Sequence, residues 1–145
     1  MNEKPILLVE DSIDDVDLAL RAFKRNHIAN PVVVKNDGVE ALEWLEDAAA
    51  RSSGQENYLP SVVLLDIKMP RMNGIEVLAK IREHEALKLL PVVMLTSSNQ
   101  DRDILESYNL RVNSYICKPV DFEQFNQAIQ TIGLYWLVLN EPPYK

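Results

Sequence analysis

Five polar residues follow short apolar runs of this sequence, and their types suit them to phosphate and cation chemistry. They are, in chain order, Glu10, Asp11, Asp66, Thr96 and Lys118. Two carboxylates about 4 Å apart repel by roughly 1 kcal/mol in water and by about 4 kcal/mol at an effective dielectric of 20. Magnesium would remove that repulsion, because it binds carboxylates and shares its remaining positions with water and phosphate oxygens. A carboxylate can also attack phosphorus to give an aspartyl phosphate, while a lysine offsets the charge of the phosphoryl group and a threonine hydroxyl donates to it.

The apolar runs before these residues predict the strands of a parallel sheet. Runs of this kind are typical of parallel strands that are covered on both faces. The predicted strands are residues 6–9, 32–34, 62–65, 91–95 and 114–117, and helices alternate with them. Such alternation predicts right-handed crossovers and helices on both faces of the sheet. Ligands of such sheets bind outside the carboxyl ends of the strands, so the five polar residues should meet there.

The first predicted helix begins near the acidic pair. Ser12 would be its N-cap, and its apolar stripe would consist of Ile13, Val16, Leu20 and Phe23. Asp14, Asp15 and Asp17 are interpreted as residues that favour the positive end of a helix rather than as ligands. In the helix after the fourth strand, we expect Ile104, Leu105 and Tyr108 to point inward.

Length and composition limit the class of protein. The 145 residues are near the commonest domain size, so we expect one domain over residues 1–145 with an apolar extension at 133–145. A net charge of -7 and a pI near 4.8 argue against binding to nucleic acid, which needs clustered Lys and Arg. Cys117 is the single cysteine, and no apolar run has the length of a signal peptide or a membrane span. We therefore expect a cytoplasmic protein without a membrane segment.

The chemical residues and their spacing closely resemble the receiver domain of two-component response regulators, over residues 5 to about 132. The matching residues are Glu10-Asp11, Asp66 within Leu-Asp-Ile-Lys-Met-Pro-x-x-Asn-Gly, Thr96-Ser97-Ser98, Tyr115 and Lys118-Pro119. The resemblance implies an α/β fold, a doubly wound (βα)5 flavodoxin-like three-layer sandwich with sheet order 2-1-3-4-5. It also implies that Asp66 accepts a phosphoryl group from a sensor histidine kinase, and that the protein signals through protein contacts rather than acting as an enzyme.

The resemblance implies roles for the remaining site residues. Asp11 and Asp66 would bind magnesium directly, Glu10 would bind it through water, and the backbone carbonyl of Lys68 would complete the site. Thr96 and Lys118 would bind the phosphoryl group. Thr96 and Tyr115 would form a switch that changes the surface of the fourth helix, fifth strand and fifth helix. The peptide bond between Lys118 and Pro119 would be cis, as is usual in the family.

Two positions and the tail distinguish this sequence within the resemblance. Glu10 stands where many receivers have Asp, and Lys68 stands two residues after Asp66, where its ammonium would tune dephosphorylation. The loop at residues 51–60 and the apolar tail are similar to those of small regulators paired with phytochrome-type histidine kinases. Residues 132–139 are apolar throughout, which predicts a homodimer or a partner contact through the fifth helix and tail. The alternative is that the tail folds back on its own domain.

Three other functions share features with this sequence. A magnesium phosphatase with an aspartyl nucleophile would have a second acid where Lys68 stands, and a substrate-enclosing insertion that this sequence lacks. A flavin-binding module would meet the acidic first loop Glu10-Asp11-Ser12, which would repel the flavin phosphate. A protein-docking module with the same site that is never phosphorylated stays open as an alternative, although a complete acidic, hydroxyl and lysine set favours chemistry.

Overall fold

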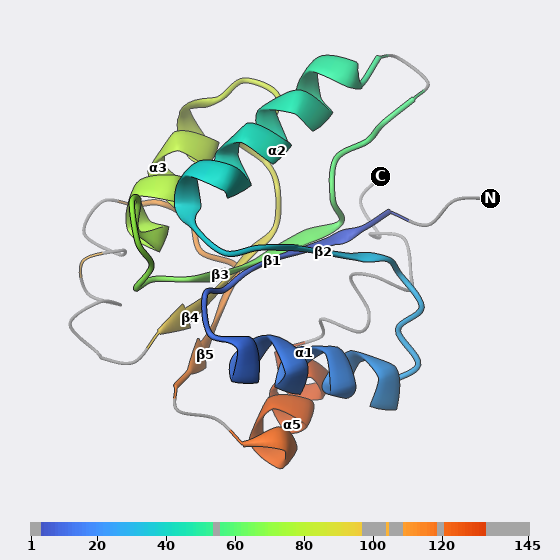
Figure 1. The fold of residues 1–145 in the computed structure, drawn as a ribbon. Helices are drawn as coiled ribbons and strands as arrows, with labels where there is room; N and C mark the ends of the chain where they lie inside the picture. The colour runs from blue at the N-terminus through green and yellow to red at the C-terminus, as the bar shows by residue number, and fades with distance from the viewer. Residues whose placement is uncertain (1–3, 54–55, 97–103, 105–108, 119–120, 133–145) are drawn as a thin grey trace.

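A parallel five-stranded sheet forms the centre of the computed structural model (Figure 1). The structure describes residues 4–53, 56–96, 104, 109–118 and 121–132. The strands are β1 (Ile6–Val9), β2 (Val32–Lys35), β3 (Val62–Asp66), β4 (Val92–Thr96) and β5 (Ser114–Cys117). They lie in the order β2-β1-β3-β4-β5, and every neighbouring pair is parallel, which confirms the predicted flavodoxin-like topology.

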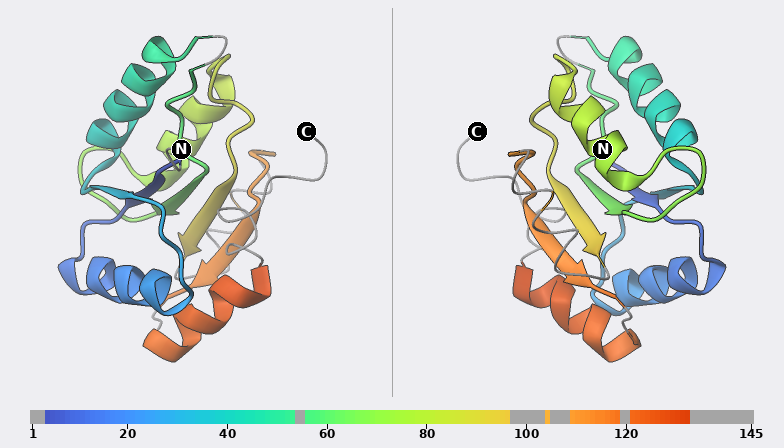
Figure 2. Two further views of the ribbon diagram at one scale, coloured as in Figure 1. Left: turned by 90° about the vertical axis from the view of Figure 1, so that its right-hand side faces the viewer. Right: turned by 90° about the vertical axis from the view of Figure 1, so that its left-hand side faces the viewer.

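Helices cover both faces of this sheet and make three layers (Figures 1 and 2). The described helices are α1 (Ile13–Arg25), α2 (Gly38–Arg51), α3 (Gly74–Glu83) and α5 (Phe122–Ile132). α1 and α5 lie on one face, and α2 and α3 lie on the other. A hydrophobic core lies on each face of the sheet, and alternate residues of β3 pack into one or the other. Val63 and Leu65 pack beneath α2 and α3, whereas Val62 and Leu64 pack toward α1 and α5. This double coverage explains why the strand sequence is continuously apolar.

The expected apolar stripe of α1 is wrong in part. Ile13 is 83% exposed and Leu20 is 39% exposed, whereas Ala19, Ala22 and Phe23 are buried. The helix packs on both the sheet and α5, where the rings of Phe23 and Phe125 meet edge to face at 6.2 Å. Small alanine side chains let a helix approach its neighbours closely, so burial follows them rather than the larger apolar residues. Ile104 is also 42% exposed, contrary to its expected inward position, and Leu105 and Tyr108 lie outside the described residues.

Polar residues begin the helices beside the sheet's carboxyl edge. Ser12 caps α1, as predicted, and Asp37 caps α2, each by accepting a hydrogen bond from a backbone N–H of the first turn. Asn73 caps α3 in a capping box, in which its side chain and that of Glu76 exchange hydrogen bonds with the opposite backbone N–H groups. Asp121 makes the same exchange with Gln124 at α5. Across the described stretches, every helix is too short or too polar to cross a bilayer.

Candidate functional site

The parallel register brings the predicted polar residues to one edge of the sheet. Asp66 and Thr96 are the last residues of β3 and β4, and Glu10 and Lys118 directly follow β1 and β5. The strand ends are level because the pairings are Val9 with Leu65, Asp66 with Leu95 and Thr96 with Cys117. The fold therefore gathers side chains that are as many as 108 residues apart in the chain.

Three carboxylates converge at this edge. Glu10, Asp11 and Asp66 each place one oxygen within 4.8 Å of the others. Glu10 has no exposed surface and Asp66 is 5% exposed, whereas Asp11 is exposed. Oxygen donors of this kind fit a hard divalent cation such as Mg²⁺ or Mn²⁺, and the exposed Asp11 leaves the set open to water ligands. The residues present therefore fit the cation that the sequence predicted.

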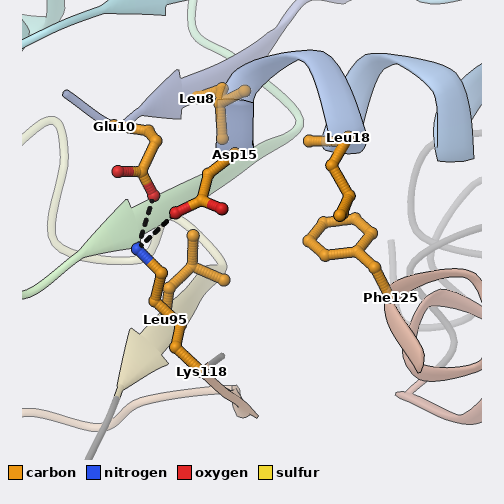
Figure 3. A pocket seen from close by; sticks show the side chains of 8 residues that line it. Leu8, Glu10, Asp15, Leu18, Leu95, Lys118 and Phe125 are labelled. Atoms are coloured by element: carbon orange, nitrogen blue, oxygen red, sulfur yellow. Dashed lines mark hydrogen bonds and ion pairs between the residues drawn. The ribbon is translucent and has the colours of Figure 1, made fainter. Parts of the chain in front are cut away.

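The ammonium of Lys118 lies among these carboxylates. Its Nζ is 3.0 Å from Glu10 Oε1, 3.4 Å from Asp66 Oδ2 and 2.9 Å from Asp15 Oδ2. Figure 3 shows Glu10 and Asp15 pointing toward Lys118 from the end of β1 and from the first turn of α1. The side chain is 19% exposed, so these charges interact in a partly desolvated space where their attraction is stronger than in water.

Burial and charge shift the protonation of this cluster. Burial raises the pKa of Glu10 from 4.5 to about 7, and the charge of Asp66 adds to the rise, while hydrogen bonds from Lys118 and the Ser12 N–H oppose it. Burial alone would lower the pKa of Lys118, but the hydrogen bonds to Asp15 and Glu10 and the nearby carboxylate charges outweigh it and raise that pKa. Lys118 therefore stays protonated, and the protonation of Glu10 depends on pH near neutrality.

The loop between β3 and α3 is held close to Asp66 and to α2. Gly74 lies so near the strand end that an added Cβ would stand 2.2 Å from the Asp66 carbonyl oxygen. Arg71, at a φ of 66°, donates to both carboxylate oxygens of Asp37, with Nη2 2.9 Å from Oδ2. The Glu40 N–H and then Arg71 lower the pKa of Asp37, which keeps this pair ionic. Lys68 is exposed in the same loop.

The two predicted switch residues lie on neighbouring strands. Thr96 is 1% exposed at the end of β4, next to the acidic edge. Tyr115 is half-buried on β5, paired in register with Met94, and packs against the core beneath α2 and α3. The Thr96 hydroxyl and the Tyr115 ring therefore lie on adjacent strands, two register positions apart.

Residues 6–130 match the response regulator receiver domain family. The chain belongs to this family. A curated relative of the receiver is the probable methanogenesis regulatory protein FilR2 of Methanothrix harundinacea, 39% identical over 95% of this chain and 86% of the relative. The family match confirms the resemblance found in the sequence.

Three solved receiver structures share the fold. The bacteriophytochrome response regulator RtBRR is 48% identical, with a TM-score of 0.76 over 99% of this chain and 85% of its own. The phosphorylated cyanobacterial phytochrome response regulator RcpA is 36% identical, with a TM-score of 0.78 over 97% and 99%. The Mn²⁺-bound form of response regulator Rcp1 is 34% identical, with a TM-score of 0.76 over 97% and 99%. The predicted similarity to phytochrome-associated regulators is thereby confirmed.

The sequence did not single out Asp15 as part of the receiver site. It was interpreted as a helix-start residue, and it does stand in the first turn of α1, but its carboxylate also contacts Lys118. The available signal was its place in the first turn of a helix that begins just after the Glu10-Asp11 pair. Two other predictions lie outside the described residues, namely the cis bond at Lys118-Pro119 and the contacts of the tail at 133–145.

Proposed function

We propose that this protein is a response regulator that takes a phosphoryl group from a sensor histidine kinase onto Asp66. One observation carries the proposal: the buried Asp66 carboxylate has the Lys118 ammonium 3.4 Å away and two further carboxylates within 4.8 Å. A nucleophile, a fixed positive charge and a cation-binding set thus lie at one place. Membership of the receiver family supports the same function.

The proposed reaction is a single in-line transfer. A carboxylate oxygen of Asp66 attacks phosphorus, the new O–P bond forms, and the bond from phosphorus to the imidazole nitrogen of a kinase phosphohistidine breaks. The imidazole keeps the electron pair of the broken bond and takes a proton from solvent. Lys118 binds a phosphoryl oxygen with its ammonium, and the Thr96 hydroxyl donates to another. Both residues therefore offset the negative charge that arrives at Asp66.

We propose Mg²⁺ as the cation of the acidic set. Asp11 and Asp66 would hold it directly, Glu10 would hold it through water, and the backbone carbonyl of Lys68 would be a further ligand. Bound there, Mg²⁺ would neutralise charge on the carboxylates and on the incoming phosphoryl oxygens. The Mn²⁺-bound form of Rcp1, a receiver of similar sequence, supports a divalent cation at this edge.

Intact mass measurement after incubation with acetyl phosphate and Mg²⁺ tests the phosphoacceptor. The wild-type protein should gain one phosphoryl group, and the Asp66→Asn variant should gain none, because the amide is not a nucleophile toward phosphorus. A wild-type protein that stays unmodified with both acetyl phosphate and a histidine kinase would instead indicate the docking module. Turnover of phosphate monoesters would indicate the phosphatase.

Phosphorylation would be reported through Thr96 and Tyr115. The added charge favours one of two states of the switch, with Thr96 drawn toward the phosphoryl group and Tyr115 turned further inward. A Tyr115→Trp variant should change its fluorescence when beryllofluoride and Mg²⁺ are added. If calorimetry shows that the variant binds beryllofluoride but its fluorescence does not change, the switch is contradicted.

The proposed donor is a phytochrome-type histidine kinase, which would place the regulator in the cytoplasm. Similarity to RtBRR and RcpA, both named as phytochrome response regulators, supports this partner. We further propose that residues 1–145 form one receiver domain. Two copies of this domain would form a homodimer through α5 and the apolar tail at residues 133–145. A version ending at Gly133 should sediment as a monomer if the full chain sediments as a dimer. If both versions sediment in the same oligomeric state, the tail takes no part in the dimer contact.

A further inference from the structure

The shortest ion pair of the site comes from a helix rather than from a strand end. Asp15 Oδ2 lies 2.9 Å from Lys118 Nζ, closer than Glu10 at 3.0 Å or Asp66 at 3.4 Å. The Asp15 side chain is 33% exposed, and that of Lys118 is 19% exposed. A contact of this length between partly shielded charges is a charge-assisted hydrogen bond with a definite direction.

The N-cap of α1 holds the backbone of Asp15 and the carboxylate of Glu10. Ser12 donates its backbone N–H to Glu10 Oε2 at 3.1 Å, and its hydroxyl oxygen accepts from the Asp15 N–H at 3.3 Å. One capped turn therefore binds the Glu10 carboxylate and fixes the backbone from which the Asp15 carboxylate reaches Lys118, and Figure 3 shows both carboxylates in contact with Lys118. The lysine has a flexible stem, so its place depends on these partners rather than on its own backbone.

Among the residues that the structure describes, the ammonium has as many carboxylate neighbours as N–H donors. Lys118 has three N–H donors, and the three carboxylates of the described residues within 3.4 Å are Glu10, Asp15 and Asp66. Only two of these acceptors, Glu10 and Asp66, belong to the three-carboxylate set that fits a cation. Asp15 can therefore accept a hydrogen bond from Lys118 whether or not a cation binds Glu10 and Asp66.

We propose that Asp15 is a positioning residue that holds Lys118 in place for phosphoryl transfer to Asp66. The inference rests on the proposed function. When the Asp66 oxygen forms its bond to phosphorus, and the bond to the leaving acetate or imidazole breaks, Asp66 ceases to be a charged acceptor. The N–H of Lys118 that faced Asp66 then donates to a phosphoryl oxygen, while another N–H of Lys118 still donates to Asp15. The ammonium reaches the transferring group without first being reoriented.

The first arm of the test compares two aspartates of the same helix turn. Asp15→Ala should lower the rate constant for phosphorylation by acetyl phosphate in Mg²⁺ about fivefold, which corresponds to one ion pair of about 1 kcal/mol. Asp14→Ala removes an exposed first-turn charge that makes no ion pair within the described residues, and it should leave the rate within about twofold of wild type. Urea midpoints verify that both variants are folded, and Asp15→Asn repeats the measurement with an isosteric side chain.

The second arm separates positioning from general charge or stability effects. On a Lys118→Met background, Asp15→Ala should have no further effect on the rate, because the group that it positions is gone. Mg²⁺ binding measured by calorimetry should be as tight in Asp15→Ala as in the wild type. Equal effects with and without Lys118, a faster Asp15→Ala protein, or a loss of Mg²⁺ binding in that variant would each overturn the inference.

The two proposals fail in different ways. A wild-type protein that gains no phosphoryl group overturns the proposed function, and the role of Asp15 falls with it. A wild-type protein that is phosphorylated normally, beside an Asp15→Ala variant of unchanged rate, overturns the role of Asp15 alone.

Discussion

The protonation of Glu10 should make the stability of the cation-free protein fall as the pH rises toward neutrality. Its carboxyl is buried with no exposed surface, and its pKa is about 7 in the folded protein against 4.5 as the usual value. Between these two values the folded protein holds a proton that the unfolded chain has released. The free energy of unfolding therefore decreases with pH across this window, and the stabilising contribution is complete only below pH 4.5.

The size of this effect follows from the gap between the two pKa values. A single proton gives a slope of at most about 1.4 kcal/mol per pH unit, so raising the pKa from 4.5 to about 7 corresponds to about 3 kcal/mol. Urea unfolding in EDTA at 25 °C, from pH 5 to pH 8, measures the slope directly. Groups other than Glu10 that titrate in this range contribute equally to variants that keep them.

The Glu10→Gln variant should lose this slope. In the wild-type protein the Ser12 N–H and the Lys118 ammonium both donate to the Glu10 carboxylate. The NH2 group of the introduced Gln would face one of these two donors, so one hydrogen bond is lost. We therefore expect a pH-independent loss of about 1 kcal/mol from one hydrogen bond, and the test is the slope rather than the absolute stability. Asp11→Asn is the matched control, because Asp11 is exposed and is not among the groups that shift the pKa of Glu10.

Mg²⁺ provides the complementary perturbation. A cation favours the ionised form of Glu10, so saturating Mg²⁺ should stabilise the wild-type protein more at pH 8 than at pH 5. The raised pKa of Glu10 is contradicted if the wild-type protein in EDTA shows no decrease in stability above pH 5. It is equally contradicted if Glu10→Gln retains the slope of the wild type.

Three further substitutions test the fold and the site. Arg82 donates to four backbone carbonyls at 2.7 to 2.9 Å, so Arg82→Lys should lower the free energy of unfolding by about 2 kcal/mol, and a loss below about 0.5 kcal/mol in urea would contradict that role. Gly74→Ala places a Cβ against the Asp66 carbonyl, so it should cost about 2 kcal/mol and weaken Mg²⁺ binding by calorimetry, whereas unchanged binding would mean that the strand end does not move. Lys68→Ala should change the lifetime of the aspartyl phosphate measured by intact mass, and an unchanged lifetime would show that the lysine does not tune dephosphorylation.

The sequence predicted the sheet well because burial on both faces leaves a direct mark on it. β3 is apolar from Val62 to Leu65 and then ends in Asp66, so one run marks both the strand and the edge at which its acid lies. Ser12 and the Asp121–Gln124 pair were likewise predictable, since helix caps need particular side chains at fixed spacings. By contrast, Ile13 and Leu20 were misplaced, because periodicity alone does not tell which side of a stripe faces a neighbouring helix.

The residue types and their spacing were enough to predict the chemical groups, the order of strands and helices, and the edge of the sheet where the groups collect. Parallel pairing imposes that edge on any residue that follows a strand. Two features came from the packing of the folded chain alone: Lys118 contacts Asp15 as well as Glu10, and burial raises the pKa of Glu10 to about 7. Such contacts depend on how α1 is set against the ends of β1 and β5. Distances and desolvation are properties of that packing and are not encoded in the spacing of residues along the chain.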